Sequence, residues 1–126
     1  MTNSKQKTSS TKKYDLEERT LKFAKRIRDF IYKLPKVLGN YEDISQLIKS
    51  SGSIGANYIE ANDALSKKDF YHRVKISRKE AKETRYWLNL VRTGESEELL
   101  KEKNYLIQEV TELMNIFGAI IQKSSV

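Results

Sequence analysis

The amino-acid sequence predicts an all-α fold, an antiparallel up-down four-helix bundle. Apolar residues recur at spacings of three and four in four successive segments, which is the period of an amphipathic helix. One proline and five glycines leave little material for the many turns of a β-rich fold. The chain of 126 residues fits one domain, and it has no cysteine, so disulfides and thiolate chemistry are excluded.

The chain divides into a short arm and the bundle. Residues 1–13 carry four lysines and no acid, and they have no apolar residue after Met1. Such a segment cannot bury enough surface to offset the entropy of ordering, so we expect a disordered basic arm. Residues 14–126 form the bundle in this interpretation. The first helix is expected to end before Pro35, and the pair at 39–40, Gly-Asn, is typical of a turn.

Three further helices follow from the pattern. The second is expected over Tyr41–Asn62, where the interior glycines Gly52 and Gly55 indicate that another helix approaches closely. Ser66 is predicted to cap the third helix, which should continue to about residue 92. Ser96 is the expected cap of the fourth.

The net charge of +7 is concentrated in the arm and in the third helix. Residues 66–92 contain nine basic and three acidic residues, whereas residues 93–126 contain three basic and six acidic ones. A helical projection of the third helix predicts a basic arc that no acid interrupts. Like charges at these spacings repel each other, so the arc favours phosphate contacts over a face that serves only solubility. The predicted nucleic-acid contacts are Lys67, Lys68, Lys75, Arg78, Lys79, Lys82 and Arg85.

The opposite side of the third helix carries a second apolar face. One apolar stripe is enough to join a bundle, so the additional residues Ile76, Trp87 and Leu90 indicate either a broad core or a subunit interface. Two pairs of polar residues, each at a spacing of three, also predict a structural polar network between the second and third helices, because interior polar groups must find partners. Its expected members are Asn57, Glu60, Glu80 and Glu83.

No catalytic or cofactor motif is found. His72 is the only histidine, and with Asp69 it gives half of a di-iron motif, so we expect no metal site and no cofactor. No apolar run approaches the ~18–20 residues that span a bilayer. The beginning of the sequence lacks the apolar stretch of a secretory signal, so we expect a soluble cytoplasmic protein. Because no catalytic motif is found, we expect no enzymatic activity.

Two sequence blocks resemble a known bacterial family. They are Ser53–Ala61, followed by Ala64, Ser66 and Asp69-Phe70, and Lys79–Leu88. Over about residues 15–123 the chain is similar to the four-helix-bundle proteins first named for open reading frames in intervening sequences of 23S ribosomal RNA genes. The resemblance implies a homopentameric ring. It also implies distant kinship with the accessory variability determinant of diversity-generating retroelements, which works with a reverse transcriptase and nucleic acid.

Two functions stay open at this point. The first is a non-enzymatic, ring-forming accessory protein that binds RNA or DNA through the basic arc and works beside a nucleic-acid enzyme. The second is a protein–protein adaptor whose basic face docks an acidic partner without nucleic acid. A hydrolase or nuclease would need a metal site shared between subunits, for which the chain offers few ligands.

Overall fold

The computed structural model describes residues 12–125, which contain four α-helices and no strand. The helices are α2 (Lys12–Tyr32), α3 (Leu38–Asn62), α4 (Lys67–Leu90) and α5 (Glu97–Gln122). A 3₁₀ turn, η1 (Lys123–Ser125), follows α5. The predicted all-α fold with four helices is confirmed. The helix α2 begins at Lys12, two residues before the expected boundary, and the rest of the predicted arm lies outside the described residues.

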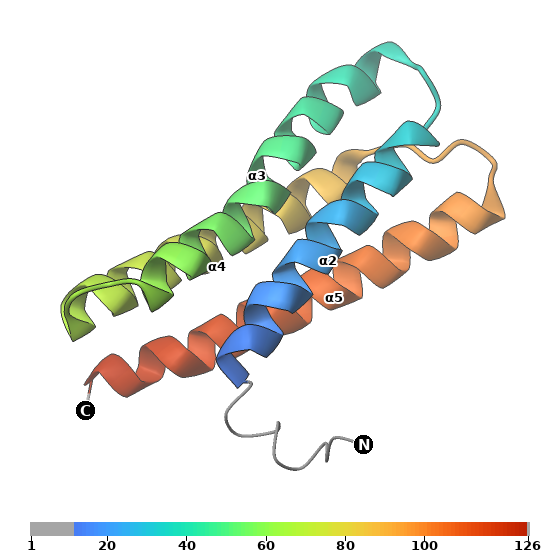
Figure 1. Ribbon diagram of the computed structural model, residues 1–126. Coiled ribbons are helices and arrows are strands. Elements are labelled where there is room, and N and C mark those ends of the chain that lie inside the picture. Colours follow the sequence, from blue (N-terminus) through green and yellow to red (C-terminus); the bar gives the residue numbers. More distant parts are fainter. Residues whose placement is uncertain (1–11, 126) are drawn as a thin grey trace, which may run out of the picture.

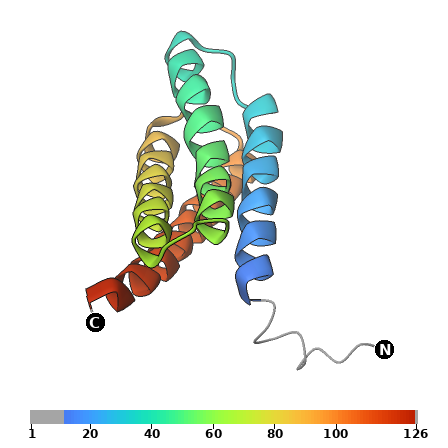
Figure 2. The ribbon, with the colours of Figure 1, turned by 60° about the vertical axis from the view of Figure 1, so that its left-hand side comes forward.

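The four helices alternate in direction along the chain (Figure 1). The α2–α3 and α4–α5 connections lie at one end of the molecule, and the α3–α4 turn lies at the other, near the last turn of α5. α3 packs against α2 on one side and against α4 on the other, and α5 packs against α4 and α2. α5 runs obliquely behind the other helices in Figure 2. α3 and α5 are therefore diagonal to each other.

Both predicted serine caps are confirmed. Ser66 accepts a hydrogen bond from the backbone N–H of Asp69 (3.1 Å), and Ser96 accepts one from Leu99 (3.1 Å). These bonds satisfy backbone donors that the first helical turn leaves free. α4 ends at Leu90, slightly earlier than expected, and Gly94 adopts a positive φ of 68° in the following loop. Glycine tolerates this conformation because it has no Cβ.

The prediction of a turn at residues 39–40 was wrong, because α3 already begins at Leu38. Asn40 is almost fully buried, and its amide donates to the carbonyl oxygens of Pro35 (3.1 Å) and Arg92 (2.9 Å). Its side-chain oxygen accepts a hydrogen bond from the backbone N–H of Arg92 (2.9 Å). Asn40 thus ties together the two connections at this end of the bundle. A local pattern cannot reveal bonds to a residue 52 positions away.

The core combines an apolar seam with a few satisfied polar side chains. The Ser77 hydroxyl donates to the carbonyl oxygen of Ile54 (2.9 Å), and Thr84 donates to Ser50 (2.8 Å). These bonds join α3 to α4 where both helices present small residues. The buried seam of α4 comprises Val74, Ser77, Ala81, Thr84 and Leu88, which recur at spacings of three and four.

The two interior glycines of α3 lie in different surroundings. A Cβ on Gly55 would lie 2.7 Å from the hydroxyl oxygen of Thr20 in α2, and that hydroxyl is held by bonds to carbonyl oxygens of α2. A Cβ on Gly52 would meet only the end of the Arg28 side chain, at 3.5 Å. The expected close approach is therefore confirmed at Gly55, while Gly52 has ordinary space.

This difference predicts opposite effects for two matched substitutions. Gly52→Ala should raise the free energy of unfolding by roughly 0.5–1 kcal/mol, because alanine favours a helix interior over glycine. Gly55→Ala should lower it, because α2 must move away to avoid the clash with Thr20. Urea unfolding followed by circular dichroism measures both. Equal effects of the two substitutions would contradict the close approach at Gly55.

Candidate nucleic-acid interface

Of the seven predicted contact residues, five lie on the side of α4 that borders α5 or η1: Lys67, Lys68, Lys75, Arg78 and Arg85. Lys79 and Lys82 belong to the same face by their helical spacing. Six are exposed and Arg85 is half-buried. The Arg85 guanidinium donates to the Thr111 hydroxyl of α5 (3.3 Å), and a Cβ on Gly118 would lie 3.5 Å from Nε of Arg78. We call these side chains the basic face: Lys67, Lys68, Lys75, Arg78, Lys79, Lys82 and Arg85. None of them forms an ion pair with a described residue.

A hollow of about 550 Å³ lies where α4 begins and α5 ends. Three lysines of the basic face line it, together with Tyr71, His72, Lys123 and Ser124. No acidic residue is part of this lining. Lys123 was not among the predicted contacts, because only the antiparallel packing of α5 places it beside Lys67 and Lys68. The hollow extends the positive surface from α4 onto η1.

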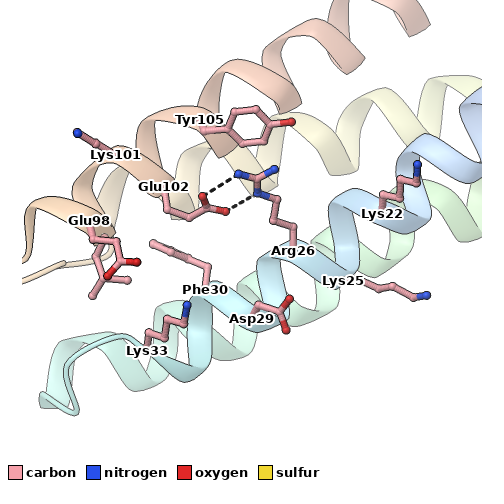
Figure 3. A pocket seen from close by; sticks show the side chains of 11 residues that line it. Lys22, Lys25, Arg26, Asp29, Phe30, Lys33, Glu98, Lys101, Glu102 and Tyr105 are labelled. Carbon is pink, nitrogen blue, oxygen red and sulfur yellow. Dashed lines mark hydrogen bonds and ion pairs between the residues drawn. The ribbon is translucent and has the colours of Figure 1, made fainter.

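Three of the five acidic residues of α5, Glu102, Glu109 and Glu112, point toward α2 and away from the basic face. Arg19 makes a bidentate ion pair with Glu109 (2.7 and 2.9 Å) and reaches Glu112 at 2.8 Å. The hydrogen bonds to Glu109 raise the pKa of Arg19 above its ordinary value. Arg26 pairs with Glu102 in the same bidentate way (2.6 and 3.0 Å), as Figure 3 shows. Two arginines thus hold three carboxylates in ion pairs on the α2 side.

The groove between α2 and α5 has a different character. Its volume is about 640 Å³, and its walls mix basic and acidic side chains around a floor that includes Phe30 and Leu99. The Arg26 guanidinium lies 3.8 Å from the centre of the Tyr105 ring, a cation–π contact. Mixed charges suit a polyanion poorly, so the basic face of α4 remains the better site. The seven-residue spacing of Arg19/Arg26 and of Glu102/Glu109 is a sequence signal that could have predicted these pairs.

The structure joins one member of the predicted polar network to the opposite helix. Asn57 of α3 accepts a hydrogen bond from the Arg73 guanidinium of α4 (3.1 Å) and donates to the carbonyl oxygen of Ser53 (2.9 Å). For Glu60, Glu80 and Glu83 no bond to the opposite helix is found within the described part of the chain. Burial raises the pKa of Glu80, and nearby Glu83 raises it further while Lys79 lowers it.

The three predicted interface residues lie on the flank of α4 that faces α3. Trp87 is half-buried against the core, and its indole N–H is buried without an acceptor among the described residues. Ile76 is half-buried, and Leu90 is 45% exposed. This flank is therefore only partly covered by the bundle itself.

The α3–α4 end brings Glu60, Asp69 and His72 to one hollow of about 330 Å³. In residues 12–125, however, no group of three or more metal-ligating side chains is placed to hold an ion. None of the described helices is both long and apolar enough to cross a membrane.

Comparison with known proteins identifies relatives of the same architecture. Residues 12–119 match the family described as 23S rRNA-intervening sequence protein. The chain is also similar to a crystal structure from Bacteroides thetaiotaomicron, described as a protein with unknown function from the S23 ribosomal protein family. The sequences are 33% identical, the TM-score is 0.71, and the alignment covers 83% of this chain and 96% of that one. No curated protein matches the chain.

Proposed function

The chain belongs to the 23S rRNA-intervening sequence protein family, and on that premise we propose that it is a non-enzymatic accessory protein that binds RNA through the basic face. In this proposal the protein acts as a homo-oligomeric ring, so that several weak contacts act together by avidity. The family name concerns ribosomal RNA, which makes RNA the first ligand to test.

The observation that carries the proposal is the absence of neutralising partners on the basic face. Six of its seven side chains are exposed, and none is paired with a carboxylate of the described residues. The pairs Lys75/Lys79 and Arg78/Lys82 each place like charges four residues apart, which destabilises the helix slightly. A phosphate backbone offers negative charges at regular spacing and would relieve this repulsion.

Binding to an RNA hairpin across a salt series tests the proposal. Because released counterions drive such binding, the affinity of the wild type should fall steeply as the salt concentration rises. An Arg78→Glu/Lys82→Glu variant should lose about two phosphate contacts, lowering the slope of log K against log salt by roughly 1.5–2. Fluorescence anisotropy measures both affinities, and light scattering checks that the variant keeps the wild-type mass.

Equal and weak binding of both proteins at physiological salt would contradict RNA recognition by this face. The basic face would then be assigned to an acidic protein partner, as in the adaptor function. Stronger binding to a duplex DNA of the same length would replace RNA with DNA as the ligand.

The proposed ring, of five subunits, needs two different complementary surfaces on each subunit. We assign the partly exposed flank of Ile76, Trp87 and Leu90 to one surface. The other is the outer side of the α2–α3 seam, where Ile48 and Ile59 are 41% and 47% exposed. Large apolar side chains on both surfaces support contacts between neighbouring subunits.

An Ile48→Lys/Ile59→Lys variant should dissociate the ring, because it introduces two unpaired charges into an apolar contact. The molar mass measured by light scattering should fall to that of one subunit. Leu65→Lys is the matched control, since Leu65 is 99% exposed in the α3–α4 turn and should leave the mass unchanged. A variant that keeps the wild-type mass would remove the α2–α3 surface from the interface, and a monomeric wild type would refute the ring.

A further inference from the structure

We propose that α5 supplies a second, uncharged half of the RNA surface, which contacts sugars and bases while the basic face holds the phosphates. This inference rests on the proposed function. It concerns the neutral stripe of α5, which we define as Asn104, Gln108, Thr111, Asn115 and Gly118.

The stripe lies beside the basic face along the seam between α4 and α5. Its residues follow each other at spacings of four, three, four and three, so they share one side of the helix. Two contacts fix where that side points. Thr111 accepts the hydrogen bond from Arg85, and Gly118 lies next to the Arg78 side chain. A strand whose phosphates lie on α4 would therefore have its other edge over α5.

The composition of the stripe is unusual for this molecule. Charged residues make up 33% of the chain, and the remainder of α5 carries seven of them between residues 97 and 112. The stripe itself has none, although Asn104, Gln108 and Asn115 are exposed. From Asn104 to Gly118 this side of α5 is therefore polar without charge, and the nearest charge in the same heptad lane is Glu97, seven residues before Asn104.

The side chains of the stripe suit RNA. Each amide presents both donors and an acceptor, which is what base edges and 2′-hydroxyl groups require. A carboxylate here would repel phosphates, and three of the five acids of α5, Glu102, Glu109 and Glu112, are instead paired with Arg19 and Arg26 on the α2 side. A protein partner with an acidic surface would gain nothing specific from three neutral amides, whereas an unstacked RNA base would.

A Gln108→Ala/Asn115→Ala variant tests the inference with the same fluorescein-labelled RNA hairpin. Alanine favours helix, so the variant should fold like the wild type. The loss of two neutral hydrogen bonds should weaken binding about tenfold. The salt slope should stay at the wild-type value, because neutral side chains release no counterions. Ser45→Ala/Gln46→Ala is the matched control on α3, diagonally opposite α5, and it should bind like the wild type.

The outcomes separate this inference from the proposed function. If the Gln108→Ala/Asn115→Ala variant binds like the wild type while Arg78→Glu/Lys82→Glu shows the expected lower salt slope, the neutral stripe is not part of the surface and the proposed function stands. If wild-type binding shows no salt dependence at all, the proposed function fails first. A reduced slope in the alanine variant would also overturn the inference, because it would show that the substitutions act through the basic side chains.

Discussion

The buried seam of α5 fixes how this helix is rotated about its own axis, and the charge pattern of the surface follows from that rotation. With Leu106, Val110 and Phe117 fully buried, Glu102 and Glu109 must face α2 while Thr111 and Gly118 face α4. Exposed ion pairs contribute little to stability, typically under ~1 kcal/mol each. Their larger consequence here is to hold Glu102, Glu109 and Glu112 on the α2 side, so that the turns of α5 from Asn104 to Gly118 carry no acid on the side toward α4.

The α3–α4 contact sets the second constraint. Small side chains and the bonds of Ser77 and Thr84 hold these helices together, which leaves the basic side of α4 free to border α5. At the end of the bundle where α3 begins, Asn40 links the α2–α3 and α4–α5 connections through its bonds to Pro35 and to the backbone of Arg92. Together these contacts present the basic face and the neutral stripe as one surface rather than as separate helix faces.

Much of this architecture could be predicted from local patterns. The four helices, the caps at Ser66 and Ser96 and the buried seam of α4 depend on spacing and on backbone chemistry within a few residues. The first turn of α3 was missed because bonds to Arg92 override the turn tendency of Gly39 and Asn40. Two placements were not predicted: Lys123 beside Lys67 and Lys68, and the neutral stripe of α5 beside the basic face of α4. Both depend on which helices pack side by side, and no single helix contains that information.

The most direct test of the account places negative charge on the neutral stripe without altering a basic residue. A Gln108→Glu/Asn115→Asp variant keeps the size and shape of both side chains and adds two carboxylates, each one helical turn before a residue that borders a basic side chain, Thr111 or Gly118. If the basic face and the stripe form one RNA surface, the variant should bind RNA much more weakly than the wild type at low salt. The difference between the two affinities should shrink as added salt screens the repulsion. Affinity equal to that of the wild type at low salt would show that RNA does not approach α5, and it would contradict the account.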